Sequence, residues 1–274
     1  MNTLTEAAGP ARTTPPRGFT ATRRPLALVE RYLVVNRHAW LVVVAGIVEP
    51  VLYLLSMGLG LGALVGQVDI QGGRAVEYAA FVAPGLLASS AMTGSLTDVT
   101  NTFFFKLRFG KFYDALLTTP LTPMDVALGE VVWALLRGGL YGLGFMAVMT
   151  ALDLPSSPWF LAAFPATLLI GWAFAATGLA ATTFFTSWQH LEYVVLVTLP
   201  MFLFSTTFYP LDVYPAPVEA VVVATPLYQA VELLRGLSLG EVGPGLLGNA
   251  AYLAAMGAIG LFVANRRLGR LLYR

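Results

Sequence analysis

The ionisable side chains that lie deepest inside apolar stretches of the chain are Glu49 and Arg137. A charge in lipid is costly, so such residues usually face a polar cavity or pair with each other. We consider two roles for them: contact with the polar head of a transported molecule, or a structural pair or hydrogen-bonded kink, with the structural role favoured. Pro50 directly follows Glu49 and lacks a backbone N–H, which predicts a bend in this segment.

A second candidate site is a basic and aromatic segment, residues 103–117, between two apolar stretches. Its basic and aromatic side chains are Phe103, Phe104, Phe105, Lys106, Arg108, Lys111, Phe112 and Tyr113. Aromatic residues and arginine are enriched in protein interfaces, so the segment is predicted to dock a soluble partner. The alternative is a basic loop that only fixes membrane orientation.

Residues for catalysis are scarce. The chain has no cysteine, and neither of its two lysines is followed by Ser or Thr, so no nucleotide-binding P-loop is present. Gly236-x-Ser238-x-Gly240 fits a nucleophile elbow, but that motif needs a preceding strand and a nearby histidine, and His38 and His190 are predicted on the opposite membrane side. We therefore expect a non-catalytic chain without cofactor or metal; any ATP hydrolysis, with its ATP and Mg²⁺, must belong to a partner.

Composition indicates a membrane protein. Of 274 residues, 57% are hydrophobic and 11% are charged, and the mean hydropathy is +0.72. Soluble domains carry roughly 25% charged residues, so this chain is predicted to be an all-α integral membrane protein. We expect lipid as its surroundings and no nucleic-acid partner.

Six apolar runs are about as long as a bilayer crossing, which needs roughly 20 residues. They are residues 39–64, 78–99, 126–151, 159–185, 191–208 and 246–264. The first run is too long for a cleaved signal peptide, so we expect it to be retained.

The basic residues predict the orientation of these spans. Six lie before the first span, three in the 103–117 segment and four after the last span, whereas the other side has only Arg74 and Arg235. Because Lys and Arg concentrate in cytoplasmic loops, both termini are predicted to be cytoplasmic.

The remaining segments are expected not to cross the membrane. Four prolines between the last two spans separate short apolar stretches at 218–224 and 227–237, which predicts re-entrant or interfacial helices on the outer face. Near the N-terminus an amphipathic pattern predicts a helix in the membrane surface, with a simple basic anchor as the alternative. The chain thus divides into a disordered tail (1–22), an amphipathic interfacial helix (23–38), a six-span domain (39–264) and a basic cytoplasmic tail (265–274).

Three runs resemble the permeases of ABC type-2 exporters. They are Tyr78–Met92 (YAAFVAPGLLASSAM), Lys111–Trp133 (KFYDALLTTPLTPMDVALGEVVW) and Phe204–Gly240 (FSTTFYPLDVYP, then PLYQAVELLRGLSLG). With Glu49-Pro50 and the following Gly58-Leu-Gly-Leu-Gly62, the likeness extends over most of the chain, and it is greatest to the nodulation-factor (lipo-oligosaccharide) exporter and daunorubicin-resistance permeases.

The resemblance implies a permease subunit in a bacterial cytoplasmic membrane. It implies a separate ATPase subunit, a second permease subunit in a homo- or heterodimer, and a coupling helix near residues 103–117 that docks on the ATPase. The cargo it implies is amphipathic, a glycolipid or a hydrophobic drug. The alternative is an ion-gradient-driven secondary transporter, which should show several intramembrane carboxylates or inverted repeats. Apart from Glu49, the sequence shows no deep carboxylate and no clear repeat. Asp98 and Glu130 lie near the inner ends of their spans, so we expect both carboxylates to be in contact with solvent.

Overall fold

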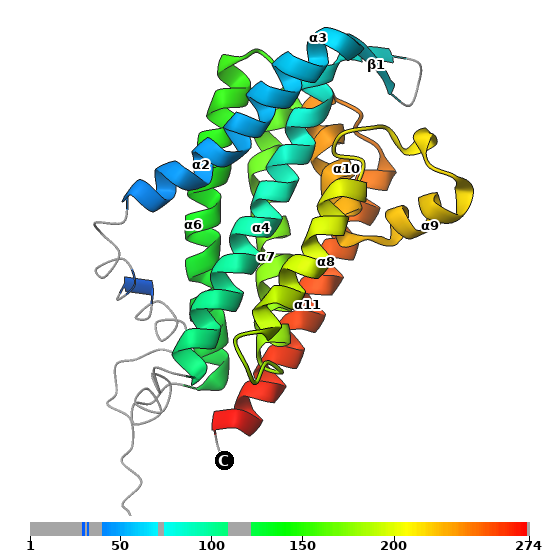
Figure 1. The fold of residues 1–274 in the computed structure, drawn as a ribbon. Helices are drawn as coiled ribbons and strands as arrows, with labels where there is room; N and C mark the ends of the chain where they lie inside the picture. The colour runs from blue at the N-terminus through cyan, green and yellow to red at the C-terminus, as the bar shows by residue number, and fades with distance from the viewer. Residues whose placement is uncertain (1–28, 31, 33–39, 71–73, 109–121, 273–274) are drawn as a thin grey trace, which may run out of the picture.

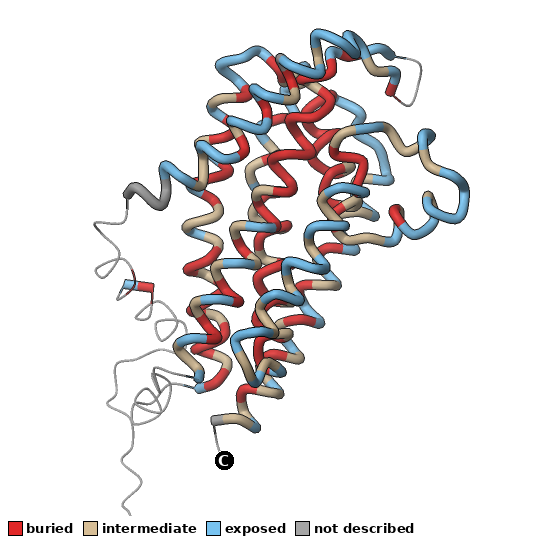
Figure 2. Tube along the Cα trace, in the orientation of Figure 1, coloured by how far each residue is buried: buried red, intermediate tan, exposed pale blue. Residues whose placement is uncertain are grey.

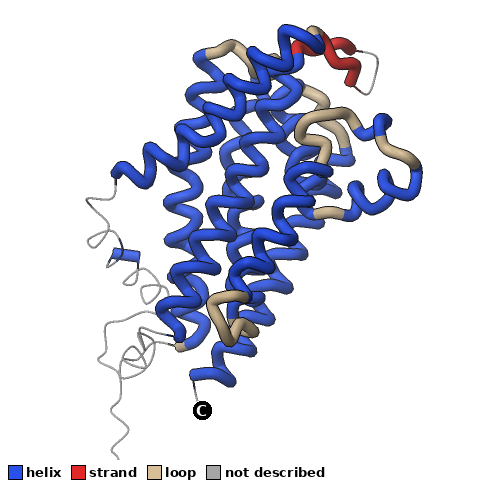
Figure 3. Tube along the Cα trace, viewed as in Figure 1, coloured by secondary structure: helices blue, strands red, loops and turns tan. Residues whose placement is uncertain are grey.

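A computed structural model describes residues 29, 30, 32, 40–70, 74–108 and 122–272 (Figure 1). Most of these residues are helical (Figure 3). Five helical segments are long and apolar enough to cross a membrane. The prediction of an all-α integral membrane protein is therefore confirmed.

The described residues form a series of helices in chain order. They are α2 (Trp40–Leu54), a π-helical segment (Leu55–Leu61), α3 (Gly62–Val65), α4 (Tyr78–Arg108), α6 (Pro123–Ala151), α7 (Ala163–Thr182), α8 (His190–Phe204), α9 (Ala216–Ala224), α10 (Pro226–Leu239) and α11 (Pro244–Leu272), with 3-10 turns at Pro158–Ala162 and Leu211–Val213.

Five of the six predicted spans correspond to the long apolar segments. These are Val44–Val65, Tyr78–Arg108, Pro123–Ala151, Pro158–Thr182 and Pro244–Leu271. The predicted span 191–208 is shorter than expected, because α8 has 15 residues. At 1.5 Å per residue it is about 22 Å long, less than the roughly 30 Å of a hydrocarbon core. It ends at Phe204 because the chain turns at Ser205–Thr207, where Thr206 has a left-handed φ of 59°.

The two short helices predicted before the last span are α9 and α10, which are bent by 82° relative to each other. Thr225 separates them and caps α10, since its hydroxyl accepts a hydrogen bond from the backbone N–H of Tyr228. Buried Arg235 fixes α10 to the end of α8: its guanidinium donates to the carbonyl oxygen of Thr206 at 2.5 Å and lies 4.0 Å from the ring centre of Phe81. Ser238 is buried within α10.

A small β-hairpin between the first two spans departs from the purely helical expectation. Strands β1 (Gln67–Ile70) and β2 (Arg74–Glu77) pair antiparallel, with Gln67 opposite Glu77 and Ile70 opposite Arg74. Ile70 and Val76 are buried while most of their neighbours in the strands are exposed, the alternation of a half-buried hairpin. Strands of four residues within a loop are too short for the alternation of their side chains to predict them from sequence.

The centre of the bundle consists of α4 and α7, with α6, α10 and α11 packed around them. Figure 2 shows buried residues along the central helices and exposed ones along α8, which has no buried residue. Glycines permit the closest helix contacts. A Cβ on Gly260 of α11 would lie 2.7 Å from the backbone nitrogen of Thr177 in α7, and one on Gly144 of α6 would overlap Ile47 of α2.

The predicted disordered tail and interfacial helix lie outside the described residues except at three positions. Of these, Val29, Glu30 and Tyr32 are helical, and Val29 and Tyr32 are buried. At the other end of the chain, α11 continues to Leu272, so most of the predicted basic tail is part of the last helix. The cytoplasmic placement of both termini stays a prediction.

Candidate functional site

A groove of about 640 Å³ lies between α2, α4, α6 and α8. In Figure 1, α2 and α8 stand on either side of α4. Glu49 and Pro50 line this groove from α2, and Arg137 lines it from α6. The two ionisable residues singled out in the sequence therefore come together in one cavity, and we call it the polar groove.

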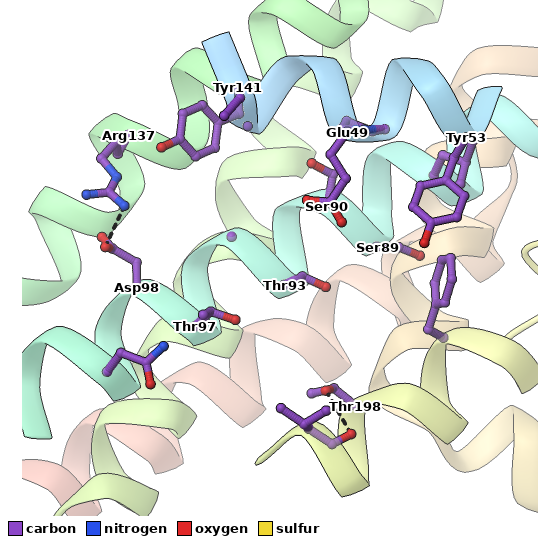
Figure 4. Close-up of a pocket in the computed structure, with 18 of the residues that line it drawn as sticks. Glu49, Tyr53, Ser89, Ser90, Thr93, Thr97, Asp98, Arg137, Tyr141 and Thr198 are labelled. Carbon is purple, nitrogen blue, oxygen red and sulfur yellow. Dashed lines mark hydrogen bonds and ion pairs between the residues drawn. The ribbon is translucent and has the colours of Figure 1, made fainter. Parts of the chain in front are cut away.

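The floor of the polar groove is a polar stripe on α4. Ser90, Thr93, Thr97 and Asn101 follow one another at intervals of three or four residues, so they lie on one face of the helix. Ser89 and Asp98 also line the groove (Figure 4), as does Thr102. Sequence reasoning missed this stripe, although three of its four residues lie at this spacing within the predicted span 78–99, a signal that could have revealed it.

Arg137 does not pair with Glu49. Its guanidinium instead lies 2.7 Å from the carboxylate of Asp98 on α4 (Figure 4). The Asp98 side chain is 10% exposed, so the expectation that it sits near the end of its span in contact with solvent was wrong. Because α4 continues to Arg108, Asp98 lies well inside the helix. The ion pair joins α4 to α6 within the groove.

Glu49 is exposed in the polar groove and makes no hydrogen bond or ion pair with any other residue in the described part of the chain. Figure 4 shows its side chain directed from α2 toward the side of the groove formed by α4. The helix is α-helical on both sides of Pro50, and its geometry changes to π-helical only at Leu55. The predicted bend at Pro50 stays a prediction.

A second groove of about 600 Å³ adjoins the first toward the hairpin. The two share Tyr53, Leu199 and Phe202. The rings of Tyr53 and Phe202 meet edge to face with centroids 6.0 Å apart. The rest of the second lining is mainly aliphatic and aromatic, from Met57 of the π-helical segment to Phe208 after α8. We call it the apolar groove.

The predicted docking segment is only partly a surface. Phe103 and Phe104 are fully buried at the end of α4, so they stabilise the bundle and do not face a partner. Phe105 is 52% exposed, and exposed Arg108 donates to the backbone carbonyl of Phe185 at 2.7 Å. The remaining residues of the prediction, Lys111, Phe112 and Tyr113, lie outside the described residues.

Lys106 is also directed inward. Its ammonium lies 3.0 Å from both carboxylate oxygens of Glu130 and 3.9 Å from the ring centre of Tyr32. The Tyr32 hydroxyl donates to the same carboxylate at 2.5 Å. Glu130 is buried, which contradicts the solvated position that its place in the sequence suggested. This cluster ties Tyr32 to the end of α4, which forms the first part of the predicted docking segment.

Both a family model and individual proteins match this chain. A family model described as ABC-2 type transporter matches residues 26–239. This range contains the β-hairpin, α2 to α10 and every residue that lines the two grooves.

Several curated relatives share the name Nodulation protein J. The chain is 32% identical to the one from Rhizobium leguminosarum bv. viciae over 211 residues, covering 77% of this chain and 80% of the relative. It is 31% identical to the one from Rhizobium leguminosarum bv. trifolii over 244 residues, covering 89% and 91%. The relative from Rhizobium meliloti (strain 1021) is 31% identical over 211 residues, covering 77% and 79%.

Proposed function

Because the chain belongs to the ABC-2 type transporter family, we propose that it is the permease subunit of an exporter whose energy comes from a separate ATPase. The polar groove is the observation that carries this proposal. An apolar helix bundle has no structural need for a row of hydroxyl and amide side chains along one face, whereas a path for a polar group across a membrane does.

The two adjoining grooves support an amphipathic cargo. A polar part of the molecule would lie against the stripe of α4, and its apolar part would lie beyond Tyr53 and Phe202. A glycolipid and a hydrophobic drug both have this division. A second permease subunit, identical or related, would close the open side between α2 and α8.

The ATPase must be a different chain, because neither lysine of this sequence stands in a P-loop. We propose that it docks on the end of α4 and the segment that follows, with Phe105, Arg108, Lys111, Phe112 and Tyr113 as contacts. Buried Phe103 and Phe104 and the half-buried Lys106 would hold the end of α4 in place beneath it.

The cargo path is tested by narrowing the groove. Thr97→Leu adds apolar bulk to the stripe, and we expect it to abolish most export while the permease still binds its ATPase. Thr150→Leu is the matched control, because Thr150 is exposed near the end of α6 and lies outside both grooves. Normal export by Thr97→Leu would place the path elsewhere.

The coupling site is tested with the partner ATPase subunit. The purified permease alone should hydrolyse no ATP. Replacing Phe112 and Tyr113 with Ala should remove co-purification of the ATPase, since each aromatic anchor in an interface contributes about 2 kcal/mol or more. Trp159→Ala, which removes an exposed aromatic ring at the opposite end of the bundle, should leave the complex intact. Export that persists without any ATPase and follows the proton gradient would favour a secondary transporter instead.

A further inference from the structure

The charged groups around the polar groove do not balance. Asp98 is paired with Arg137, and Lys106 is paired with Glu130 at the end of α4. Among the described residues that line the groove, this leaves Glu49 as the carboxylate without a cationic partner. The lining thus carries two carboxylates and one guanidinium, and its formal charge is negative. A cation would be attracted to this groove and an anion repelled, the more strongly because the surroundings are apolar.

The aromatic residues of the groove point to the same class of ligand. Tyr53 follows Glu49 by four residues and therefore lies on the same face of α2. Tyr141 packs against α2 at Gly46, where a Cβ would lie 2.8 Å from its ring, and Phe202 contributes a third ring from α8. Aromatic faces attract ammonium groups, and rings that line the same groove as an unpaired carboxylate suit a quaternary or protonated amine.

We propose that Glu49 is the group that recognises the cargo, and that the cargo is a cationic amphiphile with an ammonium group beside an apolar body. The ammonium lies at Glu49 among Tyr53 and Tyr141, and the apolar body extends past Phe202 into the apolar groove. This inference rests on the proposed function, since it assigns a charge to the molecule that the polar groove holds. An anionic glycolipid does not fit, because its charge would meet an unpaired carboxylate.

The test uses two photoreactive probes with the same alkyl-benzophenone body, one ending in a quaternary ammonium and the other in a sulfonate. The purified full chain is labelled with each in neutral maltoside micelles, and the labelled positions are mapped by mass spectrometry. We expect the ammonium probe to label residues of the two grooves. Glu49→Gln should lower that labelling about tenfold, a change within reach of one charge-assisted contact.

Two further variants separate recognition of charge at Glu49 from effects that the loss of any carboxylate would have on labelling. Glu49→Asp keeps the carboxylate and should retain most of the labelling. Glu192→Gln removes an exposed carboxylate at the start of α8, outside both grooves, and should leave it unchanged. The sulfonate probe should label the native grooves weakly and the Glu49→Gln grooves more strongly.

The outcomes distinguish this inference from the proposed function. If both probes label the grooves equally and Glu49→Gln changes neither, the amphiphile path stands and its preference for cations is refuted. If neither probe labels the grooves above the exposed face of α8, the assignment of the cargo path fails as well. Intact helical circular dichroism of each variant shows that the comparison is made on folded protein.

Discussion

The contact between α7 and α11 at Gly260 yields a sharp stability prediction. A Cβ at this position would lie 2.7 Å from the backbone nitrogen of Thr177, 2.8 Å from the carbonyl carbon of Ala176 and 2.9 Å from Cα of Thr177. These are backbone atoms, so no side-chain rotation relieves the overlap. Gly260→Ala therefore has to move the two helices apart, which loosens packing along their whole contact.

The expected loss of stability is isolated by comparison with a matched substitution on the same helix. Gly248 of α11 has no atom within 4 Å of its Cβ position, so Gly248→Ala changes helix propensity alone. Propensity cancels in the comparison of the two variants, and overpacking of about 1–3 kcal/mol remains. Gly260→Ala should be less stable than Gly248→Ala by that amount. Adding Thr177→Ala should not restore it, because the clash is with the backbone.

The assay is reversible unfolding of the purified chain in mixed micelles with increasing dodecyl sulfate, followed by circular dichroism. We expect a lower transition midpoint for Gly260→Ala than for native protein, and a native or higher midpoint for Gly248→Ala. Coincident curves for the two alanine variants would refute the close approach of α7 and α11.

Two other predictions concern the ion pair of the groove and the orientation in the membrane. Asp98→Asn and Arg137→Gln should each destabilise the fold by leaving a charge unpaired. The double variant should lose less stability than the sum of the two single variants, with a coupling energy of about 0.5–3 kcal/mol. Additive losses of stability in the same unfolding assay would argue against the pair. The chain has no cysteine, so the single replacements Asp212→Cys and Leu271→Cys can each be labelled with an impermeant thiol reagent. We expect Asp212→Cys to react in intact cells and Leu271→Cys to react only after permeabilisation. Labelling of Leu271→Cys in intact cells would reverse the predicted orientation.

Local sequence determined the class of this protein and most of its crossings. Hydropathy over some 20 residues decides whether a helix is stable in lipid, and this property does not depend on neighbouring helices. The prolines between residues 210 and 226 likewise interrupt helices locally, so the short helices α9 and α10 were predictable. The missing P-loop is also a property of the sequence alone. The end of α4 was harder to place, because the helix continues beyond the apolar run through Lys106 to Arg108.

Only the tertiary structure decided which polar groups meet. Asp98 lies ten residues before the end of α4, about 15 Å inside it, and the rotation of α4 against α6 turns it toward Arg137. The same packing buries Phe103 and Phe104 and leaves Glu49 facing a groove. Side-chain partners on different helices depend on how those helices rotate and cross, and the pattern within one helix contains no information on its neighbour's rotation. The sequence therefore identified Glu49 and Arg137 as unusual, while the fold determined which of them has a partner.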